Sequence, residues 1–177
     1  MNAASVEVAL TQIHDEARWL PAYVGVGSNL ADPQMQVRRA LQALDRLPGS
    51  RLISSSPLYR TRPFGEVVQP PFINAVAGLL SQSTPEELLA ALRTLERELG
   101  REAPRERWGP RVIDLDLLVM GREERATEIL TLPHAGIAMR DFVLYPLADI
   151  APDLEIPRLG SVASLRERVA NRGIERL

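Results

Sequence analysis

The chain has 177 residues, a formal net charge of −2 and an apolar fraction of 45%, which are typical values for one soluble domain with a hydrophobic core. The absence of cysteine excludes disulfides, thiolate chemistry and zinc–thiolate sites, and the charge offers no basic footprint for nucleic acid. No apolar run approaches the roughly 20 residues of a membrane span, and the N-terminus does not resemble a signal peptide. We therefore expect a cytoplasmic monomer with no nucleic acid, membrane or obligate protein partner.

The first part of the chain divides into an arm and the start of a domain. Residues 1–20 have mixed polarity and are assigned to an N-terminal arm, and residues 21–177 are expected to form a single domain. A short strand at 22–26 leads into the turn Gly27-Ser28-Asn29-Leu30. The polar groups of this turn can face a ligand or can simply end the strand.

A helix, a strand, a long loop and another strand are expected next. Asp32-Pro33 is typical of a helix start, with an N-cap followed by proline at the first helical position, and apolar residues keep helical spacing to position 47. Strand-like residues at 51–59 and 72–80 flank a proline-rich loop, 60–71, whose length favours a functional role over a plain hairpin. Asn74 interrupts the second strand and either satisfies a backbone group or faces a ligand.

A second helix and an arginine-rich loop follow. Thr84-Pro85-Glu86-Glu87 is a capping box, and leucines at helical spacing continue to Gly100. Glu96 lies at the edge of this apolar stripe, where an acid is unusual. Arginines between positions 101 and 111 are typical of a solvated loop, but guanidinium groups in this place also suit a phosphate clamp.

The strand after this loop carries two carboxylates on one face, Asp114 and Asp116, about 7 Å apart at their Cα atoms. Burying them unpaired costs several kcal/mol, so they need cationic partners. The partners are either two Mg²⁺ ions holding a phosphate chain, or Arg107 and Arg111 in a structural ion cluster. Alternation places the following residues on the opposite face: Ile113, Leu115, Leu117 and Val119.

The last third of the chain contains one more candidate ligand. A short apolar stretch at 129–132 precedes His134, which we expect on the same side as Asp116, although a lone histidine is more often structural. Residues 142–147 are apolar and expected in the core, and residues 162–169 are expected to form a terminal amphipathic helix.

The order strand, helix, strand, strand, helix, strand predicts an α+β fold of the ferredoxin-like βαββαβ type, an antiparallel sheet with helices packed on one face, plus a C-terminal helical tail. No glycine-rich P-loop is present, so any bound phosphates must be held by arginines and metal.

Several motifs together resemble the 6-hydroxymethyl-7,8-dihydropterin pyrophosphokinase family of folate biosynthesis over residues 22–157. The central one is Arg107-Trp108-Gly109-Pro110-Arg111-x-x-Asp114-Leu115-Asp116. The others are Gly27-Ser28-Asn29-Leu30, Tyr59-Arg60-Thr61, Phe72-Ile73-Asn74-Ala75 and Leu132-Pro133-His134.

The resemblance implies a reaction in which the β,γ-pyrophosphoryl unit of ATP moves to the pterin hydroxymethyl group and AMP leaves. By the same resemblance, Asp114 and Asp116 carry two Mg²⁺ ions, and Arg101 and Arg111 hold the transferring and leaving phosphates. Trp108 and the loop at 61–71 close over the pterin and exclude water.

The resemblance also assigns the two substrate sites. Phe72 and Phe142 sandwich the pterin ring, and Asn74 reads its hydrogen-bonding edge. The residues implied in pterin binding are Asn29, Thr61, Phe64, Phe72, Asn74, Trp108 and Phe142. Those implied in ATP binding are Glu96, Arg101, Arg111, Thr131, His134 and Arg140.

Four residues depart from the family pattern. Arg62 replaces a proline and Phe72 a tyrosine, while Ile129 and Ala135 replace an arginine and a tyrosine near the nucleotide. The last two are expected to weaken ATP affinity without abolishing the chemistry.

Two other functions compete with this one. A nucleotidyltransferase of the polymerase-β type also joins a Gly-Ser turn to an Asp-x-Asp strand, but at a spacing of about a dozen residues, whereas two helices and two strands are expected between Ser28 and Asp114 here. An inactive pterin- or nucleotide-binding module would have lost the aspartates or the clamp arginines, and this chain retains both.

Overall fold

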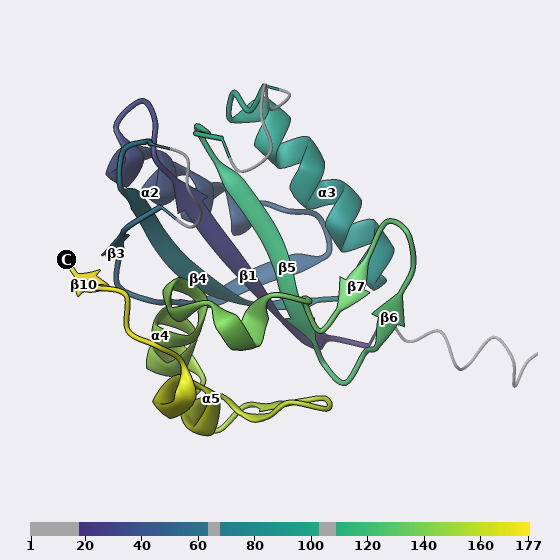
Figure 1. Cartoon of the computed structure of the whole chain (residues 1–177). Helices are drawn as coiled ribbons and strands as arrows, with labels where there is room; N and C mark the ends of the chain where they lie inside the picture. The colour runs from purple at the N-terminus through teal and green to yellow at the C-terminus, as the bar shows by residue number, and fades with distance from the viewer. Residues whose placement is uncertain (1–17, 64–67, 103–108) are drawn as a thin grey trace, which may run out of the picture.

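The fold centres on one antiparallel sheet, seen in a computed structural model that describes residues 18–63, 68–102 and 109–177 (Figure 1). The strands run in the order β10-β3-β4-β1-β5, and β2 also pairs with β4. Their bounds are β1 Leu20–Ser28, β2 Ser50–Ser55, β3 Tyr59–Thr61, β4 Phe72–Ser81, β5 Asp114–Met120 and β10 Glu175–Arg176. The central strands β1 and β4 are long and rich in small and β-branched residues, which suit a sheet that is covered on both sides.

Helices α2 (Pro33–Leu44) and α3 (Pro85–Glu98) cover one face of the sheet. Both start as the sequence predicts: Asp32 caps α2, and Thr84 and Glu87 form the capping box of α3. Their apolar stripes pack on alternate residues of β1, β4 and β5 in the larger core cluster. The two local predictions are therefore confirmed.

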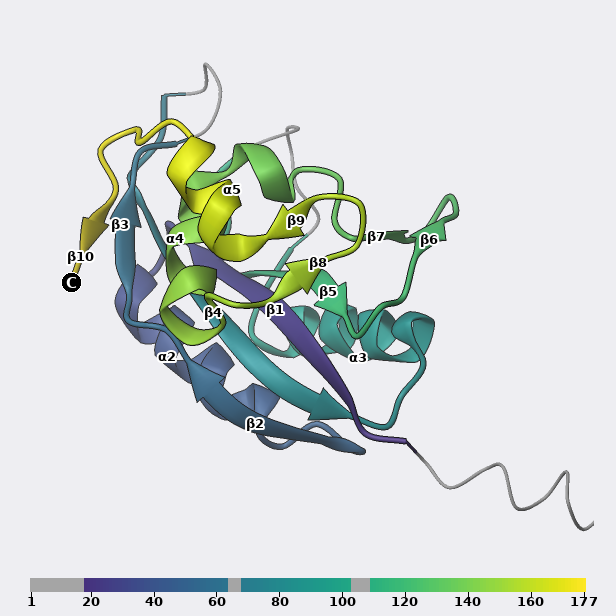
Figure 2. The same cartoon turned by 90° about the horizontal axis from the view of Figure 1, so that it is seen from below.

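The opposite face is covered as well, which differs from the expected arrangement with helices on one face (Figure 2). Helix α4 (Asp141–Ile150) and helix α5 (Val162–Arg168) pack there in a second cluster. The expected terminal helix is confirmed as α5, but α4 was expected only as core. Pro146 inside α4 argues against a helix from sequence alone, and packing overrides that preference.

Short elements complete the chain. The 3-10 helix η1 (Ile137–Met139) precedes α4, and two small hairpins are formed by β6 (Arg125–Ala126) with β7 (Thr131–Leu132) and by β8 (Glu155–Ile156) with β9 (Gly160–Ser161). In the part of the chain that the structure describes, no helix has the length and apolarity to cross a bilayer.

A β-bulge corrects the predicted alternation of the aspartate strand. Tyr23 pairs with Val119 and Val24 with Leu117, so Leu118 is an extra residue in β5. As a result Leu118 and Val119 both pack on the α4 side, and Val119 does not share the face of Leu115 and Leu117.

The α+β class with an antiparallel sheet is confirmed, while the ferredoxin-like description stays a prediction. Its second strand is divided here between β2 and β3, which pair with different stretches of β4. Strand β1 begins at Leu20, inside the range assigned to the arm, and residues 1–17 of that arm lie outside the described residues.

Candidate active site

A cavity of about 260 Å³ lies where the ends of β1, β3, β4 and β5 meet the first turn of α4. This volume is slightly below the roughly 300–1,000 Å³ found for small-molecule pockets. Residues from across the chain line it: Gly27, Thr61, Arg62, Gln69, Phe72, Asn74, Arg101, Arg111, Asp114, Asp116, His134, Arg140 and Phe142. The fold thus brings together ten of the residues expected at the site.

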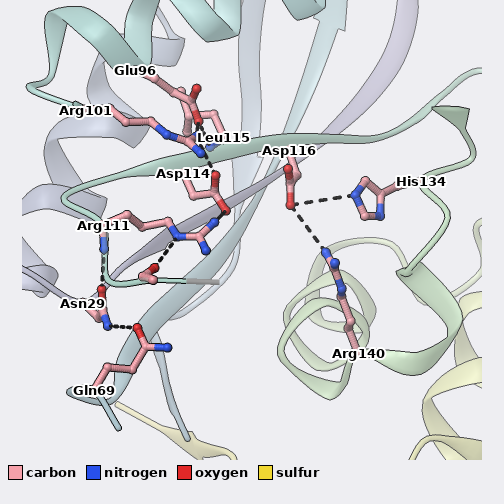
Figure 3. Close-up of polar contacts among 11 residues, drawn as sticks. Asn29, Gln69, Glu96, Arg101, Arg111, Asp114, Leu115, Asp116, His134 and Arg140 are labelled. Atoms are coloured by element: carbon pink, nitrogen blue, oxygen red, sulfur yellow. Dashed lines mark hydrogen bonds and ion pairs between the residues drawn. The ribbon is translucent and has the colours of Figure 1, made fainter. Parts of the chain in front are cut away.

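The two aspartates of β5 face the same cavity but have different partners (Figure 3). Asp114 accepts from Arg101 Nη1 through Oδ1 at 2.6 Å and from Arg111 Nη1 through Oδ2 at 2.7 Å. Asp116 Oδ2 lies 3.5 Å from Arg140 Nη1 and 4.0 Å from His134 Nε2, both longer than good hydrogen bonds. The expected approach of His134 to Asp116 is confirmed.

Burial shifts the pKa of both members of the second pair. It raises the pKa of Asp116, assisted by the nearby charge of Asp114, while His134 and Arg140 oppose the rise. Burial also lowers the pKa of His134, and its Nδ1 accepts from Gly136 N at 3.1 Å. A neutral His134 therefore carries its proton on Nε2, the nitrogen directed at Asp116.

The carboxylates are chemically suited to Mg²⁺, which takes one or two carboxylates together with substrate phosphates. Asp116 keeps oxygens that no close hydrogen bond occupies, while Asp114 is neutralised by two arginines. The described residues contain no group of three or more acidic or histidine side chains that could hold a metal without a substrate. One member of the alternative ion cluster, Arg111, does pair with Asp114, and Arg107 lies outside the described residues.

Glu96 forms an ion pair with Arg101, one of the two arginines that contact Asp114. Its side chain is 8% exposed, and its Oε1 accepts from Arg101 Nη1 and from the Leu115 backbone N–H at 2.7 Å. Burial raises the pKa of Glu96, and the Leu115 N–H and the Arg101 charge oppose that rise. Glu96 does not line the cavity, so its contact with ATP stays a prediction.

Two aromatic rings approach the cavity from different layers. Phe72 comes from the start of β4 and lies under the Arg111 guanidinium, 5.9 Å from ring centroid to Cζ. Phe142 comes from the first turn of α4 and lies under Arg140 at 5.6 Å. Two rings that line one cavity can stack on a flat heterocycle, as the sequence predicts for a pterin.

Polar groups beside Phe72 can read the edge of such a ring. Asn74 Nδ2 donates to Thr61 Oγ1 at 2.7 Å across the β3–β4 pair, which leaves the Asn74 Oδ1 as an acceptor. A Cβ on Gly27 would lie only 2.8 Å from the Asn74 Oδ1, so the Asn74 side chain can keep this orientation only with glycine at position 27.

Asn29, which was expected to bind the pterin, makes hydrogen bonds to other residues of the protein. It is 2% exposed, donates through Nδ2 to Gln69 Oε1 at 3.0 Å and to Pro70 O at 3.1 Å, and accepts from Arg111 N at 2.8 Å (Figure 3). It thus joins the chain at Gln69 and Pro70 to the chain at Arg111, and its direct contact with the pterin stays a prediction.

The structure does not place the remaining expected residues in the lining of the cavity, for two different reasons. Thr131 is exposed in β7 and does not line it, so its contact with ATP stays a prediction. Phe64 and Trp108 lie outside the described residues. Gln69 is a lining residue that sequence analysis missed, because a lone glutamine in a proline-rich loop has no spacing that marks it.

Comparisons with known proteins identify the family. The family model of 7,8-dihydro-6-hydroxymethylpterin-pyrophosphokinase (HPPK) matches residues 23–152. The 2-amino-4-hydroxy-6-hydroxymethyldihydropteridine pyrophosphokinase of Pseudomonas aeruginosa is 46% identical over 155 residues, which cover 88% of this chain and 95% of that protein. The enzyme of the same name from Haemophilus influenzae is 39% identical over 86% of this chain and 94% of its own.

A solved structure shares the fold. In a crystal structure of Plasmodium falciparum HPPK-DHPS, a triple mutant, 87% of this chain matches with a TM-score of 0.69 at 16% identity. This chain spans 45% of the length of that protein, and at such low identity the likeness concerns the fold alone. With the family model and the close relatives in agreement, the chain belongs to the 7,8-dihydro-6-hydroxymethylpterin-pyrophosphokinase family.

Proposed function

We propose that this protein transfers the β,γ-pyrophosphoryl group of ATP to the hydroxymethyl group of 6-hydroxymethyl-7,8-dihydropterin and releases AMP, a step of folate biosynthesis. The observation that carries the proposal is the pairing of two chemistries in one cavity. Asp114 and Asp116 with three arginines suit a phosphate chain, and Phe72 and Phe142 suit a flat ring.

The arginines bind the phosphates and stabilise the transition state of the transfer. The pterin hydroxyl oxygen forms a bond to the β-phosphorus as the bond from that phosphorus to the α-phosphate oxygen breaks; AMP leaves with that oxygen, and the hydroxyl proton passes to water. Arg101 and Arg111 exchange part of their contact with Asp114 for contact with the phosphates, where their fixed charge stabilises the transition state. His134 Nε2–H donates to a phosphate oxygen.

Asp114 and Asp116 would hold Mg²⁺, which supplies charge neutralisation and alignment for the phosphates. Two ions are part of the proposal, because Asp114 and Asp116 face the same cavity from alternate positions of β5. Release of Asp114 from its arginines accompanies binding, since those arginines then have phosphates as partners.

The pterin half of the cavity selects the acceptor. The rings of Phe72 and Phe142 enclose the heterocycle, the Asn74 amide oxygen accepts from a ring N–H, and Thr61 fixes the amide orientation. The Phe72 ring keeps the stacking surface of the tyrosine expected at that position.

A monomeric, cytoplasmic enzyme without nucleic acid, membrane or protein partners completes the proposal, with ATP and the pterin as its binding partners. Gel filtration with light scattering tests the monomer. A dimer mass at assay concentration would contradict it.

Coupled detection of AMP tests the activity. With ATP and Mg²⁺, we expect AMP release that requires the pterin, and no ADP. Calorimetric titration of ATP and Mg²⁺ into wild type and Asp114→Ala separates the metal site from an ion cluster, because only a metal site loses Mg²⁺-dependent binding. ADP in place of AMP, or binding of both substrates without turnover, would refute the proposal, and the latter result would identify an inactive binding module.

A further inference from the structure

Asp141 is a buried carboxylate between two residues of the cavity wall. It is 4% exposed and opens α4, and its neighbours Arg140 and Phe142 both line the cavity. A carboxylate is rarely buried to this extent without partners, because its charge loses hydration. Its Oδ1 accepts from Phe142 N and its Oδ2 from Arg172 N, each at 2.8 Å.

The second of these partners lies 31 residues further along the chain, in the segment 170–177. This segment runs from the end of α5 to β10, which pairs antiparallel with β3 (Figure 1). Leu177 N donates to Leu58 O at 2.9 Å. The Arg60–Glu175 ion pair of 2.8 Å is solvent-exposed and adds little. The segment therefore connects the first turn of α4 with the edge of the sheet.

The turn within this segment passes beside the cavity. Asn171 Oδ1 accepts from Gly173 N at 2.8 Å and from Ile174 N at 3.3 Å, an arrangement that fixes the turn. Gly173 has φ +85°, and a Cβ there would lie 3.7 Å from Nε of Arg62, a residue that lines the cavity.

The two aromatic rings of the site stand on elements that this segment joins. Phe72 belongs to β4, which is paired with β3, and Phe142 belongs to the first turn of α4. Another contact, Tyr59 Oη to Asp149 Oδ2 at 2.5 Å, ties β3 to the far end of α4. The contact from Asp141 secures the end of α4 that carries Phe142.

We propose that Asp141 is a positioning residue of this enzyme: by anchoring the segment 170–177 to the first turn of α4, it sets the spacing between Phe142 and Phe72 around the pterin. The inference rests on the proposed function. Asp114, Arg101 and Arg111 stand on β5 and the chain before it, not on α4, although Arg140, which faces Asp116, directly precedes Asp141. Loss of the anchor should therefore affect pterin binding more than the chemical step.

Steady-state kinetics of Asp141→Ala test this expectation. We expect the KM for the pterin to rise about 10-fold, below the roughly 100-fold that a misplacement near 1 Å can cost, with a smaller change in kcat. Asp141→Asn keeps one acceptor, so its KM for the pterin should lie between the values for Asp141→Ala and wild type. Asp153→Ala, at an exposed position after α4, is the matched control and should behave as wild type.

A milder variant and a measurement without turnover keep the proposal testable if Asp141→Ala fails to fold. Asn171→Ala removes an exposed acceptor and should raise the pterin KM in the same direction by a smaller factor. Amide hydrogen exchange should show the Phe142 and Arg172 amides protected in wild type, and one of the two faster in Asp141→Asn, which keeps a single acceptor.

Some results would overturn the positioning role. The first is an unchanged pterin KM in Asp141→Ala despite a lowered Tm. If Asp141→Ala does not fold, an unchanged pterin KM in both Asp141→Asn and Asn171→Ala has the same meaning. The last is a rapidly exchanging Arg172 amide in the wild-type protein. A wild-type protein without pterin-dependent AMP release would refute the proposed function instead, and amide exchange would still decide whether the anchor exists.

Discussion

Removal of the Glu96 carboxylate should destabilise the protein because Glu96 joins α3, β5 and the arginine loop at one buried point. Glu96→Ala leaves the Leu115 N–H without its acceptor, which costs about 1–3 kcal/mol. It also breaks a largely buried ion pair, for which about 3–5 kcal/mol is usual. The cost of breaking the ion pair is smaller here, because Arg101 keeps its contact with Asp114 and the Arg101 side chain is 24% exposed.

Together these terms give a loss of about 2–4 kcal/mol in the free energy of unfolding, within the roughly 5–15 kcal/mol of a typical domain. The variant should therefore fold. In urea denaturation its midpoint should fall by about 1–2 M, given a slope near 2 kcal/mol/M. Glu96→Gln keeps an acceptor for Leu115 and should lose about half as much.

Glu98→Ala is the matched control, since Glu98 lies on the same helix at an exposed position. Its free energy of unfolding should stay within about 0.5 kcal/mol of the wild-type value, as is usual for surface substitutions. A Glu96→Ala variant as stable as Glu98→Ala would refute the reasoning. It would mean that Arg101 and the Leu115 amide find water as readily as they find the carboxylate.

Four further predictions concern the site and its supports. Asp116→Ala should lower turnover by orders of magnitude in the AMP assay while the fold persists, because removing one of two adjacent acids relieves repulsion. Arg111→Ala should reduce kcat more than pterin affinity, as kinetics and calorimetry together can show. Arg93→Ala should raise the KM for ATP, since the Arg93 guanidinium donates at 3.3 Å to the backbone O of Ile129, the residue that stands where the family pattern has an arginine. Tyr59→Phe should cost about 1 kcal/mol in unfolding experiments at pH 7.

Each of these has a contradicting outcome. Near-normal turnover of Asp116→Ala would argue against metal binding, and equal losses of kcat and pterin affinity in Arg111→Ala would make Arg111 a packing residue. An unchanged KM for ATP would remove Arg93 from the nucleotide side. For Tyr59, burial and then the Asp149 hydrogen bond raise the pKa to about 12. The stability it contributes is complete below its unfolded pKa of about 10. It is lost as pH rises towards 12, so a Tyr59→Phe difference that grows with pH over this window would contradict the assignment.

Local patterns were sufficient where the physics is local. The capping box of Thr84 and Glu87 and the Asp32 cap need only a few consecutive residues, so α3 and α2 were predicted with their starts. Helix α4 was not, because Pro146 disfavours a helix locally and only packing against the sheet outweighs that preference.

The site shows the same division. The motif around Asp114 and Asp116 predicted a shared face and a need for cations, and both follow from strand geometry and the cost of buried charge. The partner of each carboxylate did not follow, since Arg101 is shared with Glu96, and Asp116 faces Arg140 and His134 from a distant segment.

The sequence by itself determined the class of fold, the starts of two helices, the paired aspartates and the family resemblance, because these depend on short spacings and residue chemistry. Only the tertiary structure decided the bulge that turns Val119 over, the loop contacts of Asn29, and the anchor between Asp141 and Arg172. These features depend on contacts between residues far apart in the sequence, which form only when helices pack on both faces of the sheet. A local spacing of residues does not predict such contacts.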